Sequence, residues 1–192
     1  MPSDASPRWS EAALEGAGRL VRRLHDALAG FVPPADAVWR LPPVSRRAGA
    51  GSFGHNDLAT DNTVYADGVP YGFIDWDLAG PAAPLQDVAL AAINFTPLAP
   101  GRFRPPGAPP PAERAARLRV FSDAYGIEDG LALLGAVEAF QRDALLDMLE
   151  YGTKGISPYR TFLANGQDQV VRRGQEWLRA NRRELERALE GP

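Results

Sequence analysis

Apolar residues recur every three or four positions between residues 10 and 29, as they do on one face of an amphipathic helix. Ser10 is a suitable N-cap for this helix, and Gly30 with the following Pro33-Pro34 pair stops it. The pattern therefore predicts one long helix near the start of the chain. Its apolar stripe consists of Leu14, Ala17, Leu20, Val21, Leu24 and Leu28.

Two short apolar runs follow a proline- and glycine-rich region, residues 31–54, for which we expect a loop with at most one short strand. The runs span about residues 63–66 and 70–74, and Asp67-Gly68 lies between them. Glycine tolerates the positive φ that tight hairpin turns require, so this dipeptide favours a β-hairpin. Pairing the two runs would bring the loop before the first strand close to the end of the second.

Helical periodicity returns after the hairpin and continues to the end of the chain, apart from one proline-rich stretch. Residues 97–111 form that stretch and predict an irregular connection. A break near Asn165-Gly166 divides the last helical region. We expect an α+β fold that is mainly helical, with one small hairpin and a helical bundle in a single domain over residues 1–192. The helical regions are predicted at about residues 85–94, 112–125, 129–151 and from 158 onward.

The composition is that of an ordinary globular protein, and it excludes several classes. Of the 192 residues, 45% are hydrophobic and 23% are charged, and a net charge of −3 leaves no basic footprint for nucleic acid. The chain contains no cysteine, which excludes disulfides and thiolate metal sites. No apolar run approaches the ~20 residues of a membrane-spanning helix, and no signal-peptide core is present. We therefore expect a cytoplasmic protein that contacts neither nucleic acid nor membrane.

Polar side chains that suit a metal site gather around the predicted hairpin. Asp57 and Asn62 lie in the loop before the first strand, and Asp75 follows the second strand. Mg²⁺ prefers oxygen ligands and usually takes one or two carboxylates with phosphates and waters, a role that Asn62 and Asp75 suit. Asp57 can accept a hydrogen bond from an attacking hydroxyl group, and His55 can hold the loop in shape. An ordinary polar loop is the alternative, but the joint spacing favours a phosphoryl-transfer site.

The order His55-x-Asp57-x(4)-Asn62, with Ile-Asp-Trp-Asp at the end of the hairpin, resembles the aminoglycoside phosphotransferase and choline kinase-like family. That family has the protein-kinase fold, and the resemblance implies its C-terminal lobe. It also implies that Asp57 is the catalytic aspartate and that His55 organises the catalytic loop. Asn62 and Asp75 would hold Mg²⁺ and, with it, ATP. The implied acceptor is a small-molecule hydroxyl group, on an aminoglycoside-like compound or an amino alcohol.

The resemblance extends over nearly the whole chain. Asp87, in the segment Pro-Leu-Gln-Asp-Val-Ala, resembles the helical aspartate that supports the catalytic loop from below. The helix predicted at residues 10–29 ends in Leu24-His25-Asp26 and resembles the long helix that precedes the catalytic loop. We therefore expect Asp87 to give structural support to the site.

The chain departs from the family in what precedes His55. A full enzyme of the family has an N-terminal lobe with a β-sheet and a lysine that binds the ATP phosphates. Here 54 residues precede His55 and none of them is a lysine, while the one lysine of the chain, Lys154, lies far downstream. We expect that the N-terminal ATP-binding lobe is absent and that the chain is a truncated phosphotransferase, inactive or weak by itself.

A catalytically silent, lobe-only binding or immunity-type protein that retains the fold is the alternative function. The motif favours the enzyme, and the missing lysine favours the silent protein. Without a covering lobe, apolar groups near Trp9, Phe53 and Phe73 are expected to be exposed, so we expect self-association or a partner that covers this surface.

Two further patterns give less specific evidence of function. Gly49-x-Gly51-x-x-Gly54 matches a phosphate-loop pattern, but no apolar strand precedes it and no helix follows it, which favours a flexible loop. Asp77 is either a second metal contact or a solvated, capping carboxylate.

Overall fold

The computed structural model describes residues 9–40, 52–82, 85–98 and 113–190. The fold is α+β and mainly helical, as the sequence predicted. Its helices are α1 (Glu11–Leu28), α2 (Gln86–Phe95), α3 (Arg114–Tyr125), α4 (Gly130–Asp147), α5 (Tyr159–Ala164) and α6 (Gln167–Glu190). Its strands are β1 (Ser52–Gly54), β2 (Thr63–Ala66), β3 (Val69–Phe73) and β4 (Gly80–Ala82). Short 3₁₀ turns cover Thr60–Asn62 and Trp76–Leu78, and a π-helical turn covers Met148–Gly152.

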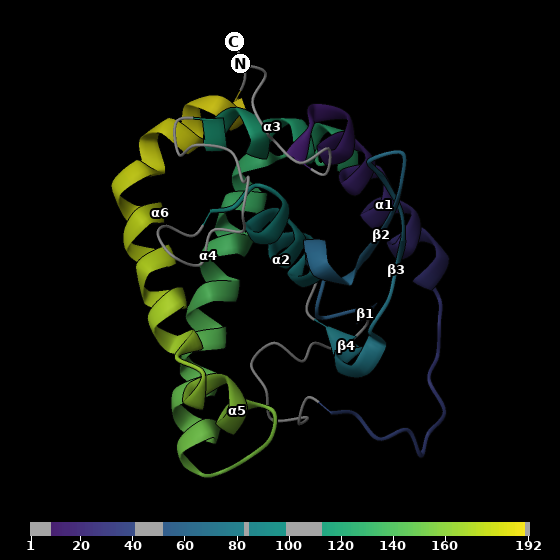
Figure 1. Ribbon diagram of the computed structural model, residues 1–192, viewed down its shortest axis with the longest axis vertical. Helices are drawn as coiled ribbons and strands as arrows, with labels where there is room; N and C mark the ends of the chain where they lie inside the picture. Colours follow the sequence, from purple (N-terminus) through teal and green to yellow (C-terminus); the bar gives the residue numbers. More distant parts are fainter. Residues whose placement is uncertain (1–8, 41–51, 83–84, 99–112, 191–192) are drawn as a thin grey trace.

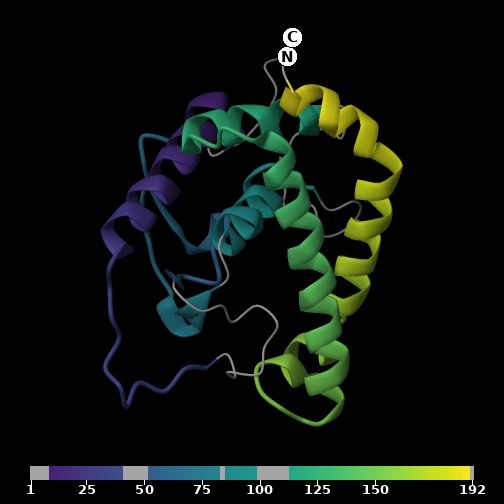
Figure 2. The same cartoon turned by 180° about the vertical axis from the view of Figure 1, so that it is seen from behind.

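Helix α2 lies at the centre of the molecule, between two groups of elements (Figure 1). On one side α4 and α6 run beside each other, with α5 near their end, and on the other side lie α1 and the strands (Figure 1, Figure 2). Small apolar side chains let neighbours approach α2 closely on several sides, which suits its central position. The buried apolar residues of α2 are Val88, Ala89, Ala91, Ala92 and Phe95.

Helix α1 confirms the helix predicted at residues 10–29. The Ser10 side chain accepts a hydrogen bond from the backbone N–H of Ala13 at 3.1 Å, so the predicted N-cap is present. Glycines inside the helix allow close packing: a Cβ at Gly16 would lie 2.9 Å from Val69 Cγ1, and a Cβ at Gly18 would lie 2.8 Å from Ala124 Cβ. The helix can therefore lie directly against β3 and α3.

The helical half of the chain follows the predicted pattern with one local difference. Asp129 is the N-cap of α4, because its side chain accepts hydrogen bonds from the backbone N–H groups of Leu131 and Ala132 in the first turn of the helix. The helix predicted to reach residue 151 changes from α to π geometry at Met148. Gly166 has a φ of +71° and separates α5 from α6, where the break was predicted. None of the described helices is both long and apolar enough to cross a lipid bilayer.

The predicted hairpin is confirmed as strands β2 and β3. They pair antiparallel, with Thr63 opposite Phe73 and Ala66 opposite Val69. Asp67 and Gly68 form the turn with φ values of 50° and 78°, and two positive φ values are what a tight hairpin turn needs. The hairpin therefore brings the residue before β2 next to the residue after β3.

A second small sheet was not predicted. Strands β1 and β4 pair antiparallel, with Ser52 opposite Ala82 and Gly54 opposite Gly80. Each strand has three residues, and β4 contains a proline. Neither strand therefore shows the alternation of apolar and polar residues that identifies a strand in a sequence. Gly49 and Gly51 of the phosphate-loop pattern lie outside the described residues, as do residues 99–111 of the predicted proline-rich connection.

The expected exposure of Trp9 is wrong. Its side chain is 4% exposed, and its backbone carbonyl accepts a hydrogen bond from Arg117 at 3.0 Å, which ties it to α3. Phe53 is half-buried, because the rings of Phe31 and Trp39 pack against it at 4.9 and 5.2 Å between centroids. The large exposed apolar side chains on and after β3 are instead Val69, Tyr71, Ile74 and Trp76.

Candidate active site

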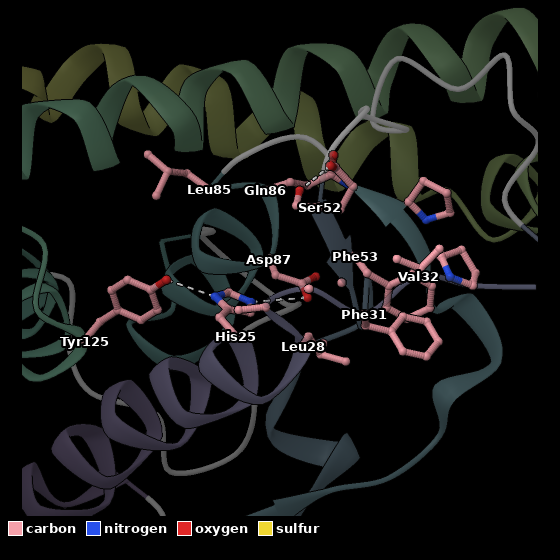
Figure 3. A pocket seen from close by; sticks show the side chains of 16 residues that line it. His25, Leu28, Phe31, Val32, Ser52, Phe53, Leu85, Gln86, Asp87 and Tyr125 are labelled. Atoms are coloured by element: carbon pink, nitrogen blue, oxygen red, sulfur yellow. Dashed lines mark hydrogen bonds and ion pairs between the residues drawn. The ribbon is translucent and has the colours of Figure 1, made fainter.

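Asp87 lies in the first turn of α2 and faces the end of α1. Its Oδ2 atom lies 3.6 Å from Nε2 of His25, and Nδ1 of His25 hydrogen-bonds the Tyr125 hydroxyl at 2.9 Å (Figure 3). Burial raises the pKa of Tyr125 above its ordinary value, Arg22 opposes this shift, and the carboxylates of Asp26 and Asp87 add to it. Helices α1, α2 and α3 therefore meet at this chain of three polar side chains.

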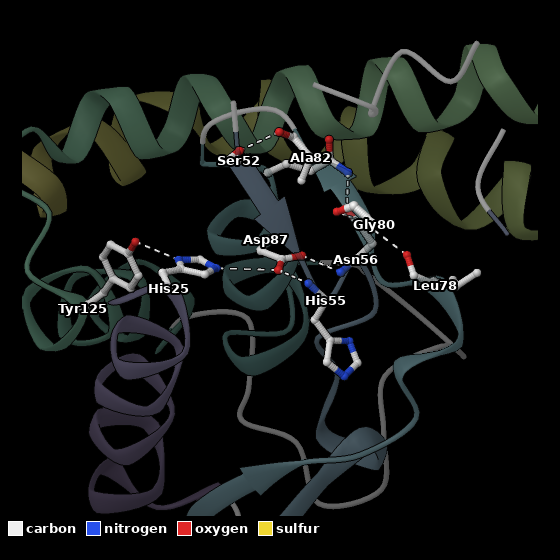
Figure 4. Close-up of polar contacts among 10 residues, drawn as sticks. His25, Ser52, His55, Asn56, Leu78, Gly80, Ala82, Asp87 and Tyr125 are labelled. Carbon is white, nitrogen blue, oxygen red and sulfur yellow. Dashed lines mark hydrogen bonds and ion pairs between the residues drawn. The ribbon is translucent and has the colours of Figure 1, made fainter. Parts of the chain in front are cut away.

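The same carboxylate holds the loop that precedes the hairpin. The backbone N–H groups of His55 and Asn56 donate to Asp87 Oδ2 and Oδ1 at 2.5 and 2.7 Å (Figure 4). Asp87 is 3% exposed, so these charge-assisted hydrogen bonds are shielded from water. Gly54 makes this approach possible, since a Cβ at that position would lie 2.6 Å from Asp87 Oδ2. Asp87 thus fixes the backbone of the loop from behind.

Asn56 joins this loop to the segment that follows the hairpin. Its side-chain amide donates to the backbone carbonyls of Leu78 and Gly80 at 3.1 and 3.3 Å, and its Oδ1 accepts from Gln86 at 3.0 Å. Its backbone has a φ of 62°, a conformation that asparagine tolerates better than most residues. Asn56 was not predicted from the sequence as a site residue. Its position between His55 and Asp57 and its tolerance of positive φ were the available signals.

His55 is completely buried below the end of β3. Its Nε2 atom hydrogen-bonds the Ile74 carbonyl at 3.0 Å, and its ring lies 4.6 Å from the Trp76 ring, measured between centroids. The backbone N–H of Ile74 donates to the Asn62 carbonyl at 3.0 Å. The loop and the end of β3 are therefore fixed to each other directly before Asp75.

Asp57 and Asn62 are in direct contact. The side-chain amide of Asn62 donates to Asp57 Oδ2 at 2.9 Å and to the Asp57 backbone carbonyl at 2.9 Å. The 3₁₀ turn Thr60–Asn62 folds the chain back so that this contact can form. With the amide nitrogen engaged by Asp57, Oδ1 is the atom of Asn62 that can bind a cation.

Asp75 follows on the neighbouring segment. It is exposed and has φ 61° and ψ 68°, a left-handed conformation that is uncommon outside glycine and concentrated at functional sites. Asp77 is also exposed, and the guanidinium group of Arg40 donates to its Oδ2 atom. Among the described residues no three His, Cys, Asp or Glu side chains are grouped to hold a metal by themselves. A cation here would depend on the Asn62 amide oxygen, on Asp75 and on oxygens from outside the protein.

Comparisons with known proteins point to one family. The chain is 44% identical over 85 residues to the trifolitoxin immunity protein of Rhizobium leguminosarum bv. trifolii, a match that covers 43% of this chain and 31% of that relative. No solved structure matches the chain. A family model described as the phosphotransferase enzyme family (APH) matches residues 2–131, which include the whole candidate site. The chain therefore belongs to the phosphotransferase enzyme family.

Proposed function

We propose that this chain supplies the catalytic loop and metal ligands of an ATP- and Mg²⁺-dependent phosphotransferase that acts on a small-molecule hydroxyl group. One observation carries the proposal. The Asn62 amide donates to the Asp57 carboxylate at 2.9 Å, and Asp75 lies two residues beyond Phe73, the strand partner of Thr63. A base and two oxygen ligands are thereby carried on adjoining segments, as phosphoryl transfer requires.

The residues fit the chemistry that each would perform. Asp57 accepts the proton of the acceptor hydroxyl as its oxygen attacks the γ-phosphorus and ADP leaves. Asn62 keeps the Asp57 carboxylate in one orientation, and His55 keeps the loop aligned with the end of β3. Because this reaction is accelerated mainly by positioning, these supporting contacts matter as much as the base.

The donor set of Asn62 Oδ1 and the Asp75 carboxylate consists of hard oxygens, which suits Mg²⁺. Bound there, Mg²⁺ would neutralise charge on the nucleotide phosphates. Asp77 would be the further carboxylate nearby, although its hydrogen bond with Arg40 favours a surface role.

Binding of Mn²⁺ with ATP tests the site without requiring turnover. Paramagnetic broadening of amide signals in the 192-residue chain is expected around Asn62 and Asp75, at weak affinity, and should disappear in Asp75→Asn. Asp67→Asn is the matched control, because it removes a carboxylate from the exposed hairpin turn, where asparagine also tolerates the φ of 50°. Broadening that is absent, or that lies elsewhere on the chain, would refute the proposed metal site.

Turnover is a separate measurement. Lys154, the one lysine of the chain, is exposed and pairs with Glu150, so it does not take the place of the family lysine that binds the α- and β-phosphates. We therefore expect no measurable phosphotransfer from the 192-residue chain alone. A fusion to the amino-terminal lobe of a family enzyme should transfer phosphate to an aminoglycoside or an amino alcohol, and Asp57→Asn should lower kcat by about 100-fold or more. Turnover by the fusion that is unchanged in Asp57→Asn would contradict the role of Asp57.

A catalytically silent immunity function is the second candidate. It is favoured by the 44% identity to a protein whose name describes immunity to trifolitoxin. Cells that express the chain would then be protected from that toxin whether or not Asp57 is replaced by Asn. Protection that is lost in Asp57→Asn but kept in Asp67→Asn would instead support an enzymatic function.

A further inference from the structure

A cavity lies behind the loop that carries the candidate active site. It has a volume of about 830 Å³ and opens between the end of α1, the segment after it, strands β1 and β4, and the start of α2 (Figure 3). Asp57, Asn62 and Asp75 are not among its lining residues. Asp87 belongs to both places, because it lines the cavity and also holds the loop.

One part of the cavity is apolar and partly aromatic. Its walls include Leu28, Phe31, Phe53 and Leu85, and the Phe31 and Phe53 rings meet edge to face with centroids 4.9 Å apart. Phe31 is 48% exposed and the neighbouring Val32 is 83% exposed, so large apolar surface at the rim is uncovered. An aryl or alkyl group placed there would remove this surface from water and find aromatic edges to pack against.

The other part of the cavity is polar and carries a negative charge. Among the described residues that line the cavity, Asp87 is the one carboxylate, and none is a lysine or an arginine. The amide hydrogens of His55 and Asn56 orient the carboxylate but do not cancel its unit charge. Nδ1 of His25 hydrogen-bonds the Tyr125 hydroxyl at 2.9 Å, and Nε2 of His25 lies 3.6 Å from Asp87 Oδ2. The charge therefore favours a cation in the cavity and disfavours an anion.

We propose that this cavity binds a small aryl or alkyl amine, with its apolar body against Phe31 and Phe53 and its ammonium group toward Asp87. The volume lies in the range of ordinary small-molecule sites, about 300–1,000 Å³. The ammonium group would lie near the carboxylate that fixes the loop of His55 and Asn56, and this carboxylate is 3% exposed. This proposal does not depend on whether the chain transfers phosphate.

Three probes of one shape test the charge preference on the 192-residue chain: 2-phenylethylamine, 2-phenylethanol and 3-phenylpropanoate. Amide chemical shifts are followed at pH 8, where the amine is still protonated. The amine is expected to bind saturably, with shifts at residues 25–33 and 52–54, and at least tenfold more tightly than the carboxylate. No saturable binding of the amine, or binding of the alcohol or the carboxylate that is as tight, would overturn the proposal.

Two tryptophan variants test the location. Asp87 is unsuitable, because its replacement would also release the loop. Ala29 is exposed and lines the cavity, whereas Ala27 is exposed at the same end of α1 and does not line it. Ala29→Trp should fill the cavity and weaken amine binding at least tenfold, and Ala27→Trp should leave it unchanged. Unchanged affinity in Ala29→Trp, or equal weakening in both variants, would place the bound amine elsewhere and overturn the proposal.

Discussion

Asn62 holds the carboxylate of Asp57 by donating its side-chain amide to Oδ2 at 2.9 Å, and it donates from the same nitrogen to the Asp57 backbone carbonyl at 2.9 Å. These contacts set the direction in which the carboxylate points. Because the amide nitrogen of Asn62 binds Asp57, its amide oxygen is left for the proposed metal. One side chain therefore connects the proposed base to the proposed metal.

Replacing Asn62 by alanine should separate stability from function. The loss of this half-buried side-chain amide removes two hydrogen bonds to Asp57, so the free energy of unfolding is expected to fall by about 1–3 kcal/mol, at about 0.5–1.5 kcal/mol for each bond. Mn²⁺–ATP broadening around Asp75 should nevertheless be lost, since one ligand is gone and Asp57 is no longer oriented. Urea unfolding and the broadening experiment measure the two effects. An Asn62→Ala variant with undiminished broadening would show that Asn62 is not a ligand.

Asp87 should be among the most costly positions to truncate. In Asp87→Ala the buried backbone N–H groups of His55 and Asn56 lose their acceptor, at about 1–3 kcal/mol each. The free energy of unfolding, measured in urea, is therefore expected to fall by about 3–5 kcal/mol. Asp123→Ala is the control, because that carboxylate is exposed and pairs with Arg119 on the surface of α3, where the change should stay below about 0.5 kcal/mol. Equal losses in the two variants would contradict the supporting role of Asp87.

Gly54 and Gly72 both lie in strands, but Gly54 is closely packed and Gly72 faces open space. A Cβ at Gly54 would lie 2.6 Å from Asp87 Oδ2, while a Cβ at Gly72 would meet nothing within 4 Å. Gly54→Ala is expected to destabilise the chain by about 1–3 kcal/mol, as overpacking does, and to shift the amide signals of His55 and Asn56. Gly72→Ala should be neutral or slightly stabilising, because alanine has less conformational freedom to lose on folding. A neutral Gly54→Ala would mean that Asp87 does not need its close approach to β1.

The Tyr125 hydroxyl should make stability depend on pH in the alkaline range. Burial raises its pKa above the ordinary value of 10.0, with Arg22 opposing and Asp26 and Asp87 reinforcing the shift. The unfolded chain therefore loses this proton first, so the stabilisation is complete below about pH 10 and is lost as the pH rises through the folded-state pKa. The difference in unfolding free energy between the natural chain and Tyr125→Phe should shrink from pH 9 to pH 11. A difference that stays constant over this range would contradict the raised pKa.

Local sequence was sufficient for the helices and for the hairpin. The apolar stripe with Ser10 at its start predicted α1, the Asp67-Gly68 turn predicted the pairing of β2 with β3, and Asn165-Gly166 predicted the break before α6. These features depend on the period of apolar side chains and on the φ values that single residues tolerate. Both properties are contained within a few neighbouring residues, so they can be read without knowing the rest of the fold.

The tertiary structure alone decided what surrounds the candidate site. The pairing of β1 with β4, the contacts of Asn56 with Leu78 and Gly80, and the burial of Trp9 all join residues far apart in the chain. The sequence could propose His55, Asp57, Asn62 and Asp75 by spacing, but not the partners that orient them. Three-residue strands have too few positions to show a period, and an asparagine acquires its hydrogen bonds only when distant backbone carbonyls arrive. Long-range packing brings those groups together, and no local pattern encodes it.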